Sequence, residues 1–144
     1  MTDKYSLCHD YELFNELSTQ QLHAVSTYCR EECFYPDTIL FEDGEPAQKM
    51  YVLVEGEIKL FYAIGEAGMV EVDRVAPGGI FGCSALVPPY IHPSTALAKT
   101  RIEVLELDAV GLRRLFDEDP RLAVSIQRHV MRCLLDCIIN LRLG

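Results

Sequence analysis

Residues 50–75 read MYVLVEGEIKLFYAIGEAGMVEVDRV, in which short apolar segments are separated by turn residues. Ile58, Leu60 and Tyr62 alternate with the residues between them, and the arm that follows Gly68 alternates in the same way. A period of two is typical of strands with one buried face. This stretch therefore predicts two antiparallel strands joined as a hairpin.

The same pattern extends over residues 32–107, where segments rich in Val, Ile, Phe and Tyr are divided by turn signals. These signals include Asp43-Gly44, Glu55-Gly56 and Pro77-Gly78-Gly79. Many short strands with regular turns favour a compact antiparallel β-barrel.

Helices are expected on both sides of the barrel. Ser18 begins a capping box within residues 12–30, which predicts an N-terminal helix with one buried face as far as about Arg30. Asp108 and Asp119 can each cap a helix, and the second is followed by a first-turn proline. We therefore expect C-terminal helices over residues 108–142.

Composition bounds the class of protein. The chain has 144 residues and 49% hydrophobic composition, which is enough for one domain to bury a core without disulfides or metal. We expect residues 1–144 to form this single domain. No apolar run approaches the ~18 residues of a membrane span, so we expect a cytoplasmic protein without membrane contact. The formal net charge of -9 disfavours direct DNA binding.

Five segments in order suggest a family: Leu40–Glu45 (LFEDGE), Met50–Ile58 (MYVLVEGEI), Ala76–Gly82 (APGGIFG), Ala98–Thr100 (AKT) and Glu103–Leu107 (EVLEL). Together they resemble the effector domain of the catabolite-activator and fumarate-nitrate-regulator family, which is shared with cyclic-nucleotide-gated channels and protein kinase A regulatory subunits. The resemblance implies a mainly β fold, a double-stranded β-helix or jelly-roll barrel with flanking helices. It also implies an internal phosphate-binding cassette and a long C-terminal helix that dimerises. Because the chain stops at Gly144, we expect the sensor without a helix-turn-helix DNA reader.

The resemblance also implies where a ligand binds. Family members that bind cyclic nucleotides have a Glu after the Phe-Gly pair and an Arg that pairs with the cyclic phosphate, whereas this chain has Cys83 and His92. Arg suits that role because it donates two parallel hydrogen bonds to one anion. We therefore predict a degenerate cassette that binds cyclic AMP or cyclic GMP poorly, with any residual binding strengthened as His92 gains a proton. The candidate ligand residues are Phe81, Gly82, Cys83, Ser84, His92, Ser94 and Thr95.

The cysteines have a structural and a functional interpretation. Cys29 and Cys33 are four residues apart, as are Cys133 and Cys137, and Cys8 precedes a histidine near the amino end. Two helical thiols at this spacing share one face and supply half of a zinc site. Free cysteines are usually small buried hydrophobes, so we expect core packing and no metal.

The last helix carries two apolar rows. Ile126, Val130, Cys133 and Cys137 follow alternating spacings of four and three, as in a coiled-coil seam. One row can pack on the barrel, and the other then needs a partner. We predict a homodimer through Ile126, Val130, Cys133, Leu134, Cys137, Ile138 and Leu141.

No nucleophile elbow, Walker-type loop or metal-hydrolase motif is present in the sequence, so we expect no catalytic residues. The favoured function is a regulatory module that senses a small molecule and signals through its C-terminal helix to an unidentified protein partner. One alternative is a structural or protein-interaction domain without a ligand. Another is a redox or haem sensor that uses Cys83 or His92, since thiolate and imidazole are usual haem ligands.

Overall fold

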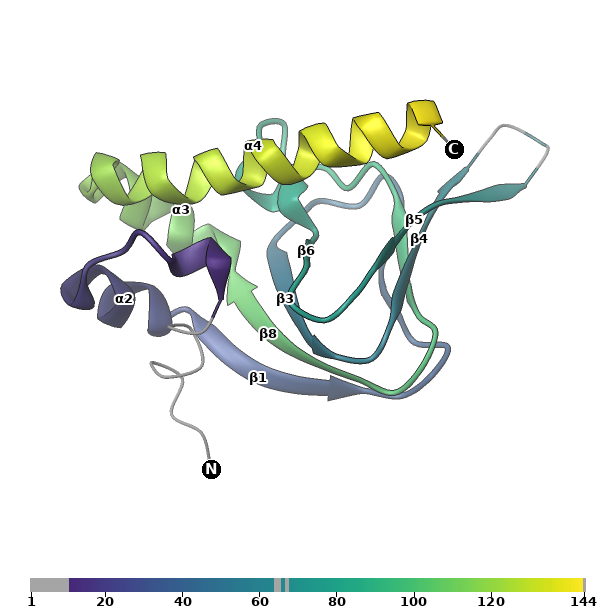
Figure 1. The fold of residues 1–144 in the computed structure, drawn as a ribbon, viewed down its shortest axis with the longest axis horizontal. Coiled ribbons are helices and arrows are strands. Elements are labelled where there is room, and N and C mark those ends of the chain that lie inside the picture. The colour runs from purple at the N-terminus through teal and green to yellow at the C-terminus, as the bar shows by residue number, and fades with distance from the viewer. Residues whose placement is uncertain (1–10, 64–65, 67, 144) are drawn as a thin grey trace.

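A computed structural model describes residues 11–63, 66 and 68–143 of the chain (Figure 1). Its strands form two antiparallel sheets, one in the order β1-β8-β3-β6 and one in the order β2-β7-β4-β5. The strands are β1 Cys29–Phe34, β2 Ile39–Phe41, β3 Lys49–Glu55, β4 Ile58–Ala63, β5 Met69–Val75, β6 Ile80–Phe81, β7 Thr95–Ala98 and β8 Ile102–Asp108. The helices are η1 Glu12–Phe14, α2 Thr19–Ser26, η3 Cys83–Leu86, α3 Ala109–Glu118 and α4 Pro120–Leu143, where η marks a 3-10 helix. The predicted jelly-roll class is confirmed, with its strands arranged as two facing sheets.

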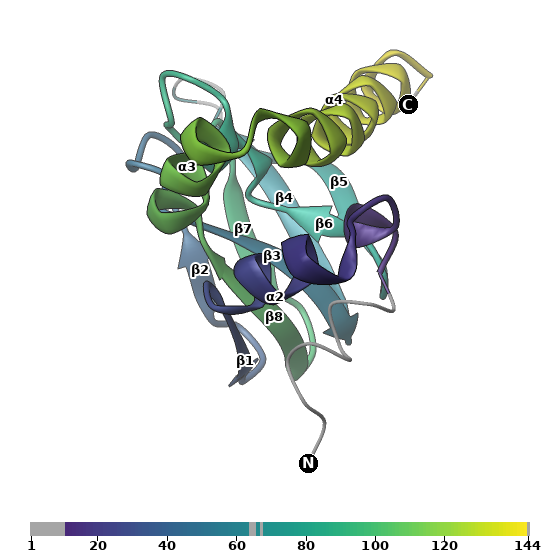
Figure 2. The same ribbon diagram turned by 90° about the vertical axis from the view of Figure 1, so that its left-hand side faces the viewer.

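The central part of strand β3 is buried on both faces of its sheet. Met50 and Val52 point toward the helices, whereas Tyr51 and Leu53 point between the two sheets, as the period of two in β3 requires. Figure 2 shows that α2, α3 and α4 lie on the side of this sheet that faces away from the other sheet. From there α4 runs across the end of the two sheets toward the β4–β5 hairpin (Figure 1).

The N-terminal helix is shorter than predicted. The capping box is present, since the Ser18 hydroxyl accepts from the Gln21 N–H at 3.1 Å and the Gln21 side chain accepts from the Ser18 N–H at 2.9 Å. The helix nevertheless ends at Ser26, and β1 begins at Cys29, which pairs with Leu107 of β8. The prediction of a helix as far as Arg30 is wrong because Cys29 and Arg30 pair with β8 as part of a strand.

The predicted hairpin and C-terminal caps are confirmed. Strands β4 and β5 pair antiparallel along their lengths. The Asp108 carboxylate accepts from the N–H groups of Val110 and Gly111 at 3.1 and 3.3 Å at the start of α3. The Asp119 carboxylate accepts from the Leu122 N–H at 3.2 Å in the first turn of α4. Each cap satisfies backbone donors that have no partner within the helix.

The expected dimer seam on α4 faces the protein's own core. Ile126 and Val130 are 0% exposed and belong to the core cluster that includes the buried side chains of α2 and α3. They are therefore not available to a second chain. Cys133, Leu134 and Cys137 are half-buried and face a cavity. The predicted seam is therefore wrong at Ile126 and Val130. Ile138 is exposed, and the side chain of Leu141 lies outside the described residues.

Neither α4 nor any other helix in the described ranges combines the length and apolar character needed to cross a bilayer.

Candidate functional site

A cavity of about 110 Å³ lies between β4, β5, the β6–η3 segment and α4. Six of the seven candidate ligand residues line it: Phe81, Gly82, Cys83, Ser84, His92 and Ser94. Thr95 does not. Its hydroxyl oxygen accepts from the Asp43 N–H at 3.0 Å, and its side chain lines a separate hollow with Ile39 and Leu97. The expectation that Thr95 faces the ligand pocket is therefore wrong, because the alternation along β7 turns it to the other face.

Gly82 directs the chain into the cavity. It has φ +77° immediately before η3, a conformation that favours glycine. A Cβ at this position would lie 3.2 Å from the Lys49 carbonyl oxygen and 3.4 Å from the Met50 Cα. Glycine therefore permits both the turn and the close approach to β3 that bring Cys83 and Ser84 to the cavity wall.

His92 is a buried, uncharged side chain. It is 3% exposed, its ring stacks on Phe41 with centroids 3.7 Å apart, and its Nδ1 has no hydrogen-bond partner. The backbone holds it in place, because the His92 N–H donates to the Glu45 carbonyl at 2.9 Å and its carbonyl accepts from the Gly44 N–H at 2.8 Å. Burial lowers the pKa of His92 from 6.5 to about 4. His92 is therefore uncharged near neutral pH, and the expected strengthening of anion binding on its protonation would require a pH near 4.

Three thiols gather at the cavity from distant parts of the sequence: Cys83 is the first residue of η3, and Cys133 and Cys137 lie on α4. Burial raises the pKa of each thiol, to about 12 for Cys137, so all three are protonated at neutral pH. The Cys137 thiol donates to a carboxylate oxygen of Asp73 on β5 at 3.2 Å. Cys83 was a candidate ligand residue, whereas Cys133 and Cys137 were expected to be core packing and instead form part of the cavity wall.

The other cysteines are separate from this group. Cys29 is buried in the core, and Cys33 is exposed on the same strand, β1, so this pair does not share a helix face. Within residues 11–63, 66 and 68–143, no three His, Cys, Asp or Glu side chains are placed to hold a metal ion. Cys8 and His9 lie outside the described residues.

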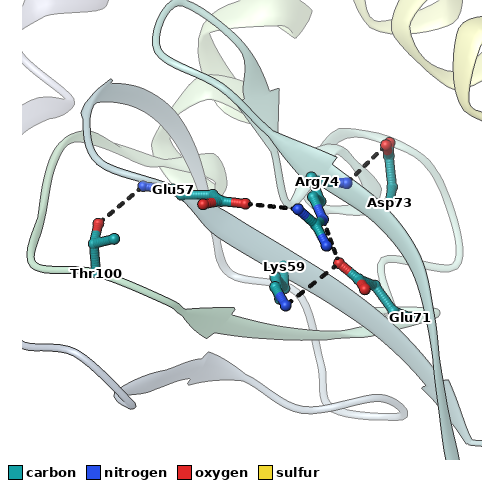
Figure 3. Close-up of polar contacts among 6 residues, drawn as sticks. All are labelled: Glu57, Lys59, Glu71, Asp73, Arg74 and Thr100. Atoms are coloured by element: carbon teal, nitrogen blue, oxygen red, sulfur yellow. Dashed lines mark hydrogen bonds and ion pairs between the residues drawn. The ribbon is translucent and has the colours of Figure 1, made fainter.

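Asp73 is the one charged side chain among the described residues that line the cavity, which include no Arg or Lys. Its second oxygen accepts from the Arg74 N–H at 2.8 Å. Figure 3 shows that the Arg74 guanidinium points away from Asp73 toward Glu71 and Glu57, at 2.7 and 3.5 Å. The cation next in sequence is therefore committed to other carboxylates. Strand alternation suggested that Asp73 faces solvent, so its position in the cavity wall was missed.

The short helix η3 is anchored to both C-terminal helices. The Arg113 guanidinium of α3 donates to the Ala85 carbonyl at 2.8 Å and to the Ala47 carbonyl, and it lies 3.8 Å above the centre of the Tyr90 ring. Gln127 of α4 donates to the Leu86 carbonyl at 2.9 Å. Neither anchor carries a sequence signal, because each joins residues far apart in the chain.

Comparison with known proteins agrees with this geometry. A solved protein from Geobacter metallireducens GS-15 superposes with a TM-score of 0.85 and 27% identity, covering 96% of this chain and 99% of that one. The regulatory domain of Toxoplasma gondii PKA, solved with cAMP, has a TM-score of 0.76 at 19% identity, over 92% of this chain and 49% of that one. The CRP-like cAMP-activated global transcriptional regulator of Mycobacterium tuberculosis is 22% identical over 66% of this chain and 42% of its own length.

The chain spans less than half the length of the curated relatives that it matches. Residues 31–119 match the sequence profile of the cyclic nucleotide-binding domain. This match covers more than half of the chain and includes the β6–η3 segment and most of the cavity wall. The chain therefore belongs to the cyclic nucleotide-binding domain family, whose members are typically regulatory rather than catalytic.

Proposed function

We propose that this domain is a non-catalytic sensor that transmits the occupancy of its cavity through α4 to a partner. The observation that supports this proposal most directly is the shared cavity wall: Cys133, Leu134 and Cys137 of α4 line the same space as Cys83 and Ser84 of the β6–η3 segment. A ligand in this space contacts both. The hydrogen bond from Gln127 to η3 adds a second connection between the cavity wall and α4. A ligand that contacts α4 better in one position of the helix than in another shifts the equilibrium between these two conformations.

The proposed partner is a second copy of the chain. Met131, Leu135 and Ile138 are 60%, 56% and 54% exposed on α4, and their spacings of four and three match a coiled-coil seam. An exposed apolar row of this kind is unusual on a soluble monomer. The same row on a second α4 complements it by two-fold symmetry.

The cassette is proposed to be degenerate toward cyclic nucleotides. Relatives include a regulator named as cAMP-activated and a kinase regulatory domain solved with cAMP, which makes a cyclic nucleotide the first ligand to test. Cys83 and the neutral His92 line the cavity where the family resemblance places a Glu and an Arg. An anion there lacks the charge-assisted contacts that usually stabilise it. We therefore propose weak binding of cyclic AMP and cyclic GMP.

We also propose that the domain acts in the cytoplasm and does not itself bind DNA. The net charge of -9 opposes a phosphate backbone, whose binding depends on clustered basic residues.

Amide hydrogen exchange tests the sensor proposal. A thermal-shift screen over nucleotides and central metabolites first identifies a ligand, since a molecule that binds only the folded state raises Tm. Exchange is then measured in α4 with and without that ligand, and added protection at residues 127–138 is expected. A ligand that raises Tm but leaves α4 unchanged would contradict the proposal.

Gln127→Leu provides the matched variant for this measurement. The substitution removes the hydrogen bond to the Leu86 carbonyl but lies outside the cavity wall. Ligand binding should be retained, and the protection that binding adds to α4 should be smaller than in the wild type.

A further inference from the structure

The charge that lines the cavity is negative. The Asp73 carboxylate is part of its wall, and in the described part of the chain no lysine or arginine joins it there. The carboxylate is held in place by the Arg74 N–H at 2.8 Å and the Cys137 thiol at 3.2 Å. Arg74 itself points toward Glu71 and Glu57 on the opposite side (Figure 3). An anion that entered the cavity would therefore meet a fixed negative charge and no compensating cation.

The polar groups that remain in the wall are neutral. His92 stacks on Phe41 and is uncharged at neutral pH because burial holds its pKa at about 4. Burial also raises the pKa of Cys83, Cys133 and Cys137, so the thiols stay protonated. Protonated thiols are weak hydrogen-bond donors that pack much like apolar groups. They offer an anion little compensation for the water that it loses on entry.

The rest of the wall carries no charge. It is mainly apolar, with the neutral hydroxyl-bearing side chains of Tyr62, Ser84 and Ser94 beside Phe41, Leu60, Val72, Ile80, Phe81 and Leu134. A mainly apolar pocket with a few convergent polar groups is typical of a small-molecule site. Apolar contact surface and the polarisable faces of the aromatic rings stabilise an uncharged ligand.

We propose that this cavity binds an uncharged, largely apolar molecule, such as one built on an aromatic ring, and discriminates against anions of the same shape. This inference rests on the proposed sensor function and names the class of ligand that the sensor binds.

Two single-ring probes of nearly the same shape test the discrimination, because a cavity of about 110 Å³ admits only a molecule of about this size. Benzenesulfonamide is neutral at pH 7.5, and benzenesulfonate carries one negative charge. In titrations of the full chain at pH 7.5, the neutral probe is expected to bind about tenfold more tightly or better. Equal or tighter binding of the sulfonate would overturn the inference.

A pair of substitutions on α4 tests where the neutral probe binds. Cys133→Phe fills the cavity and should abolish binding of the probe. Val124→Phe places the same ring on the exposed face of the same helix, where Val124 is 52% exposed, and should leave binding unchanged. If Cys133→Phe retains full affinity, the probe binds elsewhere and the inference fails.

A second pair tests the electrostatic cause without changing the shape of the cavity. Asp73→Asn removes the charge from the wall while keeping a side-chain oxygen for the Arg74 N–H, and it should tighten sulfonate binding by about threefold or more. Glu55→Gln removes the same charge from an exposed side chain on β3 that does not line the cavity, and should change the affinity of neither probe. Unchanged sulfonate affinity in Asp73→Asn would refute the electrostatic discrimination.

Hydrogen exchange separates the two proposals. A neutral probe that binds in the cavity without protecting α4 would support the ligand class and contradict signalling through α4. Preferential sulfonate binding that protects α4 would contradict the ligand class and support signalling.

Discussion

Acidification should destabilise this domain through His92, and His92→Phe should remove that sensitivity. The native imidazole is buried against Phe41 with no partner for Nδ1. Burial lowers its pKa to about 4, whereas an unfolded chain has the ordinary value of 6.5. Between these values the unfolded state binds a proton that the native state does not, so the free energy of unfolding falls as the pH falls. Phenylalanine retains a ring for the stack and cannot titrate.

The magnitude follows from the two pKa values. His92 should lower the free energy of unfolding by about 2 kcal/mol between pH 7 and pH 5, and by about 3 kcal/mol near pH 4, relative to a residue that does not titrate. Other groups titrate in both proteins, so the difference between wild type and variant isolates His92. Urea denaturation at pH 7 and pH 5 measures this difference.

The variant should therefore gain about 2 kcal/mol on the wild type as the pH falls from 7 to 5. His23→Gln, at an exposed position on α2, controls for loss of a histidine as such. The measured quantity is the free energy of unfolding of His92→Phe minus that of the wild type. If this difference changes by less than about 0.5 kcal/mol between pH 7 and pH 5, His92 is not a buried neutral imidazole.

Three further outcomes are expected. Leu135→Glu should convert the dimer to a monomer in light scattering, whereas Val110→Glu, a substitution at a 42% exposed position on α3, should leave the dimer intact; a wild-type monomer at micromolar concentration would contradict the seam. Gly56→Ala should lower the free energy of unfolding by about 2 kcal/mol more than Gly44→Ala, because both glycines have positive φ but only at Gly56 would a Cβ meet a carbonyl oxygen, at 2.5 Å; equal losses in urea denaturation would refute this. Cyclic AMP should bind with a dissociation constant of roughly 1 mM at pH 7.5 and no more tightly at pH 6, since His92 stays uncharged; micromolar binding in calorimetry would show that the missing charge is supplied elsewhere.

Local chemistry could be predicted well from the sequence. The capping box at Ser18 and the cap at Asp108 each involve residues within three positions of one another, so the pattern contains all the information needed. The β4–β5 hairpin was predictable for the same reason. The family resemblance then placed Cys83 and His92 in one cavity, although they come from different segments.

Features that depend on contacts between residues distant in the sequence could not be predicted in the same way. Cys29 continues the helical spacing of α2, but β8 pairs with it and makes it part of a strand. On α4, both apolar rows have coiled-coil spacing, and only the packed core determines that Ile126 faces inward and Leu135 faces outward. The charge state of His92 depends on its burial against Phe41, a contact between residues that are distant in the sequence.

Arg113 has a consequence for the order in which the domain opens. One guanidinium contacts Ala47 before β3, Ala85 in η3 and Tyr90 in the following loop. Three segments that would otherwise open separately therefore lose contacts together when α3 detaches. Cooperative units of this kind exchange their amide hydrogens with a common free energy of opening. The segment of residues 83–92 should accordingly open with α3 as one unit and remain protected when the β4–β5 hairpin frays.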